Sequence, residues 1–233
     1  MIIFGIDIRV YFLLFLTYSF AGWCMEVIGK LIQYKRFINR GFLVGPYCPI
    51  YGTGALLITI FLTKYVDDLV ALFVMSSIFG AVLEYFTSYI MEKIFKTRWW
   101  DYSTHKYNLN GRISLTTTLG FGALGVILIH FLNPFFEKVM GLFPDLVLTI
   151  VSIVLAVIIL TDIIISFNVI SNIKRVDLSD AIDTTDEITA KVKEILRSKS
   201  LLNKRLVIAF PNLKVKIPEN LRKLGEMAKN NKK

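Results

Sequence analysis

Two glutamates, Glu26 and Glu84, lie inside strongly apolar stretches of this chain and are its best candidates for chemistry. An ionisable side chain at membrane depth costs about 3 kcal/mol or more, so it marks a functional site by default. Such a carboxylate can carry a proton or contact a substrate, or it can form a structural ion pair that holds helices together. Both interpretations stay open from the residues alone.

The two glutamates share the same local pattern. Each follows a serine and a glycine at helical spacing, Ser19 and Gly22 before the first, Ser77 and Gly80 before the second. On a helix these three positions share one face, and the glycine lets another helix approach closely. A basic loop follows each glutamate, and its arginines, Arg40 and Arg112, are the expected partners of the carboxylates.

The pattern continues beyond each basic loop. A Gly-x-Gly-Ala-Leu segment occurs at 52–56 and again at 120–124. The ordered combination predicts two parallel two-helix repeats, about 10–63 and about 69–133. Substrate sites in repeat-built membrane proteins commonly lie at the repeat interface. We therefore expect Glu26, Glu84, Arg40 and Arg112 to form either a substrate-binding site or a structural lock between the repeats.

Composition indicates a membrane protein. Apolar residues make up 55% of the chain, the mean hydropathy is +0.58, and 19% of residues are charged, against roughly 25% in a soluble domain. Stretches long enough to span a bilayer occur at about 10–33, 47–63, 69–91, 114–133 and 146–170. We predict an all-α polytopic helix bundle of about five spans, of which the second and fourth also fit tilted or re-entrant elements. The last span adds a third intramembrane acid, Asp162.

The distribution of charge predicts an orientation and a tail. Lysine and arginine gather in the loops at 30–40 and 92–112, which places these loops inside, the N-terminus outside and the C-terminus in the cytoplasm. Residues 1–173 form the predicted bundle, and 174–233 form a basic, partly helical cytoplasmic tail that anionic lipid would attract. The tail lacks interleaved aromatics and nucleic-acid motifs, so nucleic acid is not an expected partner.

The loop at 41–52 has an unusual backbone. Pro46 and Pro49, framed by glycines, prevent a regular helix through the second proline. One interpretation is a broken helix start or re-entrant segment whose amides meet an anion. The other is a stiff loop in which Tyr47 and Tyr51 are interfacial aromatics.

The loop at 98–112 mixes aromatic and polar side chains, chiefly Trp100, Asp101, Tyr102, Asn108 and Asn110. They fit either a headgroup anchor or a polar site. Acid–base chemistry on a lipid headgroup would need a nucleophile beside Asp101, and the chain has no G-x-S-x-G, Walker or metal-ligand pattern. We expect no catalytic residue, no cofactor and no metal.

Several of these motifs together resemble a known family. They are Trp23-x-x-Glu26, the loop from Gly41 to Gly52, Glu84, and the runs 99–103 and 108–112. Over about residues 10–170 the chain is similar to the bacterial "putative ABC-transporter type IV" membrane proteins, described as ABC transporter permeases. The resemblance implies a transport role in a bacterial cell (inner) membrane.

The chain carries no Walker A sequence, so an ATP-driven role requires a separate nucleotide-binding subunit. Five spans make a small permease half, and a homodimer or larger assembly is expected within the lipid bilayer. The alternative is a non-transporting membrane scaffold or sensor whose basic tail docks a partner or anionic lipid.

Overall fold

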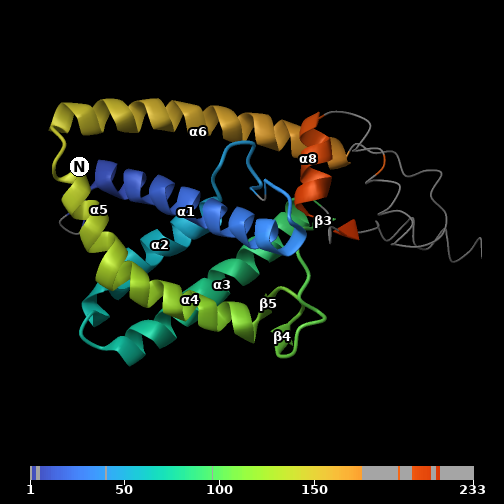
Figure 1. Ribbon diagram of the computed structural model, residues 1–233, viewed down its shortest axis with the longest axis horizontal. Helices are drawn as coiled ribbons and strands as arrows, with labels where there is room; N and C mark the ends of the chain where they lie inside the picture. Colours follow the sequence, from blue (N-terminus) through green and yellow to red (C-terminus); the bar gives the residue numbers. More distant parts are fainter. Residues whose placement is uncertain are drawn as a thin grey trace, which may run out of the picture.

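The computed structural model describes residues 2–3, 6–39, 41–95, 97–174, 194, 201–210 and 214–215. The described chain is built almost entirely of helices, as predicted (Figure 1). The helices are α1 (Ile8–Tyr34), α2 (Pro49–Leu62), α3 (Leu69–Phe95), α4 (Leu115–Ile127), α5 (Asn133–Met140), α6 (Asp145–Lys174) and α8 (Leu201–Ala209). A 3-10 turn (η1, Thr63–Tyr65) follows α2, and a π-helical segment (η2, Leu128–Leu132) joins α4 to α5.

Three short antiparallel strand pairs complete the described structure. They are β1 (Ile2–Ile3) with β2 (Ile6–Asp7), β3 (Thr97–Arg98) with β6 (Lys214–Val215), and β4 (Asn108–Leu109) with β5 (Ile113–Ser114). Each strand has two residues, so these pairs shape the chain ends and loops rather than a core.

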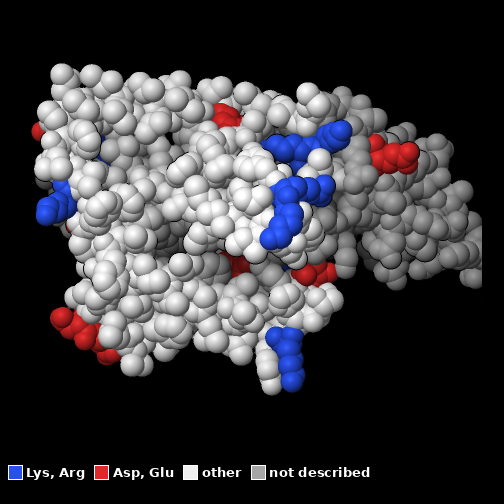
Figure 2. Space-filling model, viewed as in Figure 1, with Lys and Arg blue, Asp and Glu red and all other residues white. Residues whose placement is uncertain are grey.

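Four helices are long and apolar enough to cross a membrane. They are Ile8–Tyr34, Leu69–Phe95, the continuous stretch Leu115–Met140, and Asp145–Asn168. On the face drawn in Figure 2, most charged side chains lie toward the two ends of the molecule, and its middle is mainly uncharged. The chain is therefore a multi-pass membrane protein.

Of the five predicted spans, the one at 47–63 is not shown as a full-length helix, and it is one of the two that also fit a tilted or re-entrant element. The helix there, α2, has 14 residues and is about 21 Å long, short of the roughly 30 Å hydrocarbon core. Its first residue is Pro49, because proline fits a helix start but not a helix interior. The chain between α1 and α2 folds back toward α6 before α2 begins (Figure 1).

The core consists of two antiparallel helix pairs, α1 with α2 and α3 with α4, which α2 and α3 bring together. Glycines allow the close approach within each pair. A Cβ at Gly52 would overlap the Ser19 hydroxyl, and a Cβ at Gly122 would overlap that of Ser77. The same serine–glycine contact thus occurs in both pairs.

A buried polar network joins the first helix pair to the segment after α4. The Tyr18 hydroxyl donates to Asn133 Oδ1 at 2.6 Å, and Asn133 Nδ2 donates to Thr59 Oγ1 at 2.9 Å. Asn133 follows the π-helical turn directly and precedes Pro134. The wider turn fits this position, since proline cannot donate an amide within a regular helix.

Helix α8 packs against the bundle at the end of α6 opposite the N-terminus (Figure 1). It buries Leu206, Val207 and Ala209, so this part of the predicted tail is docked. Arg205 donates to the carbonyls of Phe42 and Val44 at 3.4 and 3.5 Å, and burial holds the pKa of its guanidinium below the ordinary value. The tail predictions for 175–193, 195–200, 211–213 and 216–233 lie outside the described residues.

Replacing Gly122 with alanine is expected to destabilise the α3–α4 pair by about 1–3 kcal/mol. The new Cβ would meet the Ser77 hydroxyl and the Phe73 carbonyl oxygen, 2.9 Å away, which cannot rotate aside. Gly120→Ala is the matched control in the same helix, because a Cβ there meets nothing within 4 Å. Thermal unfolding in detergent measures the difference, and equal stability of both variants would contradict this packing.

Candidate functional site

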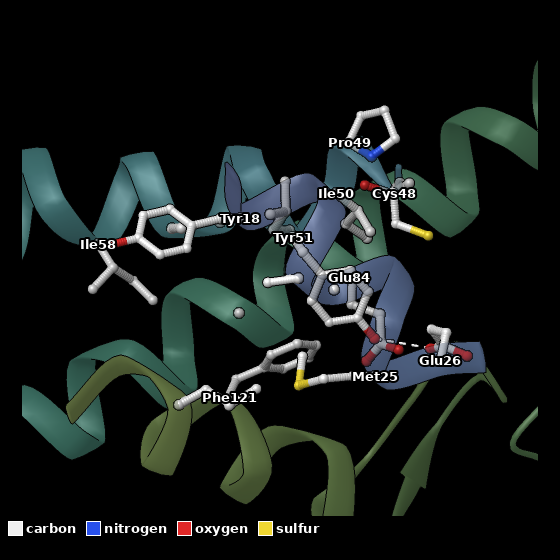
Figure 3. A pocket seen from close by; sticks show the side chains of 18 of the residues that line it. Tyr18, Met25, Glu26, Cys48, Pro49, Ile50, Tyr51, Ile58, Glu84 and Phe121 are labelled. Carbon is white, nitrogen blue, oxygen red and sulfur yellow. Dashed lines mark hydrogen bonds between the residues drawn. The ribbon is translucent and has the colours of Figure 1, made fainter. Parts of the chain in front are cut away.

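A cavity of about 360 Å³ lies between the two helix pairs, and both intramembrane glutamates line it. Glu26 reaches it from α1 and Glu84 from α3 (Figure 3). Most of the other lining side chains are apolar, among them Met25, Ile58 and Leu83. The fold thus brings the two predicted carboxylates to one largely apolar cavity.

Glu26 is held by a tyrosine of the neighbouring helix. The Tyr51 hydroxyl donates to Glu26 Oε1 at 2.8 Å (Figure 3). Tyr51 lies where a side chain at position 22 would otherwise project, since a Cβ at Gly22 would overlap its ring. The glycine one turn before the carboxylate therefore makes room for the group that binds the carboxylate.

Glu84 is deeper, with 7% of its surface exposed. The Tyr102 hydroxyl, from the loop after α3, donates to Glu84 Oε1 at 3.0 Å. The other oxygen, Oε2, is buried and forms no hydrogen bond with any described residue. The Thr117 hydroxyl of α4 lies near this carboxylate, but it donates its proton to the Ser114 carbonyl at 2.9 Å, so Oε2 has no donor among the described residues. Leaving a buried carboxylate oxygen unsatisfied is costly.

The second helix pair lacks an equivalent of the Tyr51 hydroxyl. Phe121 packs on Gly80 as Tyr51 packs on Gly22, because a Cβ at Gly80 would overlap the Phe121 ring. Phenylalanine offers no hydroxyl, and the hydrogen bond to Glu84 comes instead from Tyr102. The two carboxylates are also close enough for their charges to interact.

The structure describes only one of the two arginines that were predicted to pair with the glutamates. Arg40 lies outside the described residues. Arg112 is buried and donates to Glu92 Oε2 at 2.9 Å and to Ser88 Oγ at 3.1 Å. Its guanidinium also lies over the rings of Tyr85 and Tyr89, 5.7 and 5.5 Å from their centroids.

The carboxylate that Arg112 binds is therefore Glu92, which the sequence analysis did not single out. Glu92 also accepts from Arg98 Nε at 3.1 Å. It lies two helical turns beyond Glu84 on α3, about 12 Å along the axis. That spacing, which keeps both residues on one face of the helix, was the signal that could have identified it.

Asp162 fixes the loop between α1 and α2 rather than lining the cavity. Its two carboxylate oxygens accept the backbone amides of Val44 and Gly45 at 3.0 and 2.7 Å. Ser166, one turn further along α6, donates to the same carboxylate at 2.9 Å. Gly45 is required here because a Cβ would come within 2.8 Å of Asp162 Oδ2. The loop amides thus bind an internal carboxylate.

Side chains of α1 and of the segment before residue 41 also hold the loop between α1 and α2 in place. Trp23 Nε1 donates to Asn39 Oδ1 at 2.7 Å, and Asn39 Nδ2 donates to the Val44 carbonyl at 3.2 Å. Tyr47 lies over Gly45, and Pro46 is exposed. Of the predicted residues in this region, Tyr51 lines the cavity, whereas Trp23, Pro46 and Tyr47 are not among its lining residues.

Asparagines shape the turn of the 98–112 loop. Asn110 and Gly111 both have positive φ, as an Asn-Gly hairpin turn requires, and they join β4 to β5. Asn108 accepts from the Gly111 amide at 2.9 Å and donates to the His105 carbonyl at 2.8 Å. Asn110 Nδ2 donates to the Tyr85 hydroxyl at 3.0 Å, which ties the turn to α3.

The start of the same loop carries the residues nearest the cavity. Asp101 accepts the Ser103 amide at 3.0 Å, and Trp100 Nε1 donates to the Arg112 carbonyl at 3.1 Å. These bonds position Tyr102 against Glu84, and both Trp100 and Tyr102 line the cavity. Within the described part of the chain, no group of three or more His, Cys, Asp or Glu could hold a metal.

Replacing Asp162 with alanine should expose Cys48, the buried residue that ends the loop. The change removes the acceptor of two backbone amides, and we expect roughly tenfold faster alkylation by membrane-permeant N-ethylmaleimide. The background is Cys24→Ser, because the chain has only these 2 cysteines.

Thr161→Ala is the control for this experiment. Thr161 is exposed on the same helix, and its hydroxyl donates to the Val157 carbonyl of that helix. Equal alkylation rates in the Asp162 and Thr161 variants would show that Asp162 does not hold the loop.

Comparison with known proteins identifies a family for most of the chain. The family model described as "Putative ABC-transporter type IV" matches residues 13–167, which include both glutamates, both loops and most of α6. Comparisons with curated proteins and with solved structures found no match. The family match spans well over half of the sequence, and the chain belongs to the putative ABC-transporter type IV family.

Proposed function

We propose that this chain is the membrane-spanning permease component of a transport system, with the cavity between the helix pairs as its substrate site. The observation that carries the proposal is the pair Glu26 and Glu84, one from each helix pair, facing one cavity. Family membership supports a transport role. The substrate would bind between the pairs, where a change in their packing would alter access to it.

The two helix pairs are, in this proposal, parallel repeats. Helices α1 and α3 run in roughly the same direction, and α2 and α4 return beside them (Figure 1). Matching contacts support the duplication: Ser19 with Gly52 and Ser77 with Gly122, Gly22 with Tyr51 and Gly80 with Phe121. These contacts make Gly122 the equivalent of Gly52. The Gly-x-Gly-Ala-Leu motif instead aligns Gly52 with Gly120, two residues earlier.

A substrate site explains the carboxylates better than a structural lock does. A lock should satisfy both oxygens of a buried carboxylate, because an unpaired one costs stability. Glu84 Oε2 is unsatisfied among the described residues, and the nearby Arg112 binds Glu92 instead. For Glu26 and Arg40 the lock interpretation remains a prediction.

The basic loops suggest how the component is oriented and assembled. The ends of α1 and α3 that carry these loops, together with α8, form the proposed cytoplasmic side. A separate nucleotide-binding subunit would dock there, since the sequence has no Walker A motif. A homodimer, or a larger assembly with another membrane subunit, would complete the permease.

A membrane sensor is the second candidate function, and the docking of α8 on the bundle favours it. Arg205 of α8 contacts carbonyls of the loop that Asp162 also holds. A partner or anionic lipid that displaced the tail would therefore act directly on this loop. Deletion of 174–233 distinguishes the two functions, because a transporter core should still move substrate and a sensor should lose its response.

Glu26→Gln and Glu84→Gln are expected to abolish activity while leaving membrane insertion intact. Glutamine keeps the size of the side chain and removes the charge on which the site depends. The measurement is rescue of a strain lacking the gene, alongside the amount of protein in the membrane fraction.

Glu137→Gln is the matched control, since Glu137 is exposed on α5 and is not among the cavity-lining residues. Full rescue by both cavity variants at normal protein levels would overturn the substrate site and leave the structural lock. Co-purification of a nucleotide-binding subunit with all three variants would show that assembly is unaffected.

A further inference from the structure

We propose that the cavity binds an amphipathic organic cation, an ammonium group on an elongated apolar body, with the ammonium at Glu84. The inference rests on the proposed substrate site and names the chemical class that fits it. Three features carry the argument: the unsatisfied carboxylate oxygen, the charges around the cavity, and the apolar character of its far end.

The unsatisfied oxygen requires a donor. Glu84 is 7% exposed, it lines the cavity, and its Oε2 accepts no hydrogen bond from the described residues. A buried charge is stable only when it is paired and hydrogen-bonded. An ammonium group supplies both the positive charge and the N–H donors in one small unit.

The lining selects the sign of the ligand charge. Among the described lining residues there are two glutamates and no lysine, arginine or histidine. A phosphate or carboxylate in the cavity would meet Glu84 without any of these cations to balance it. A cation is attracted instead, and the mostly apolar lining makes this attraction stronger than it would be in water.

Aromatic rings beside the carboxylates add to cation binding. Tyr51, Trp100, Tyr102 and Phe121 all line the cavity. The face of an aromatic ring attracts an ammonium group that lies within about 6 Å of the ring centroid. The Tyr51 hydroxyl donates to Glu26, so its oxygen can still accept a hydrogen bond from an N–H of the ligand.

The apolar part of the ligand has its own place. Figure 3 shows Glu26 and Glu84 at one end of the labelled side chains and Tyr18 and Ile58 at the other. Leu128 and Leu132, from the π-helical segment, also line the cavity. A cavity of about 360 Å³ is within the range of small-molecule sites, so it can hold a chain or ring attached to the ammonium.

An inorganic cation fits less well. Divalent ions take six or more oxygen ligands, or fewer nitrogen and sulfur ligands, and the described residues hold no cluster of three such side chains. The ammonium of an aminophospholipid shares the proposed chemistry, but its phosphate would need a cation that the described lining lacks. The free amphipathic amine is therefore the favoured source.

The test uses the purified full-length chain in phosphatidylcholine nanodiscs, with empty nanodiscs to subtract partitioning into lipid. Isothermal titration compares 6-phenylhexylamine with 6-phenylhexanol and 6-phenylhexanoate, which keep the apolar body and change the head group. The amine should bind at least about tenfold more tightly than the alcohol, because a hydrogen bond between charged groups is stronger than one between a neutral group and a carboxylate. The carboxylate should show no saturable binding.

Variants then assign the binding to Glu84. Glu84→Gln should weaken amine binding about tenfold or more, whereas Glu137→Gln should leave it unchanged. Amine binding can also be measured in nanodiscs that contain phosphatidylethanolamine. Weaker binding there would show that the lipid amine competes for the same site, which supports an ammonium ligand. Equal binding of amine and alcohol, or amine binding that survives Glu84→Gln, overturns the inference.

The outcome is separable from that of the proposed function. If Glu84→Gln abolishes rescue in cells and the amine does not bind the native protein, the ligand class is wrong and the substrate site stands. If Glu26→Gln and Glu84→Gln both rescue fully in cells, the substrate site itself is wrong, whatever the amine does.

Discussion

The architecture depends on two glycines that lie one helical turn before the intramembrane glutamates. At Gly22 and Gly80 the missing side chains let an aromatic residue of the neighbouring helix lie directly against the backbone. The aromatic rings then form part of the cavity wall beside the carboxylates. Packing within each helix pair and the shape of the site between the pairs are thus consequences of the same contact.

The two halves use that contact differently. Tyr51 fills the position beside Gly22 and binds Glu26 through its hydroxyl, while Phe121 fills the position beside Gly80 and cannot bind Glu84. A tyrosine from the following loop replaces only one of the bonds that a buried carboxylate needs. Glu84 Oε2 is left without a hydrogen bond among the described residues, and the proposed ligand would contact this oxygen.

Several features could be predicted from the sequence because they depend on local patterns. The apolar stretches predict the long helices, the positions of Glu26 and Glu84 predict a shared polar site, and Pro49 predicts an irregular start of the second helix. The sequence motif pairs Gly52 with Gly120, whereas the contacts pair Gly52 with Gly122, two residues later. Only the side chains opposite them distinguish Gly120 from Gly122.

Other features depend on contacts between distant segments, which a local pattern cannot specify. Asp162 binds amides about 120 residues away in sequence, and nothing near it indicates a loop-binding role. Glu92 forms ion pairs with Arg98 and Arg112, and only the fold shows that these two arginines reach it. Tyr102 was one aromatic among several in its loop, and the Asn-Gly turn and strand pair bring its hydroxyl to Glu84.

The central claim is that Glu26 and Glu84, from different helix pairs, face one cavity. Cross-linking tests it most directly: cysteines at positions 26 and 84, with Cys24 and Cys48 replaced by serine, are treated in membranes with a short bismaleimide. Cysteines at 26 and 84 should form an intramolecular cross-link detectable by mass spectrometry, and cysteines at 26 and 137 should form none. Reaction of each single cysteine without a cross-link between 26 and 84 would contradict it.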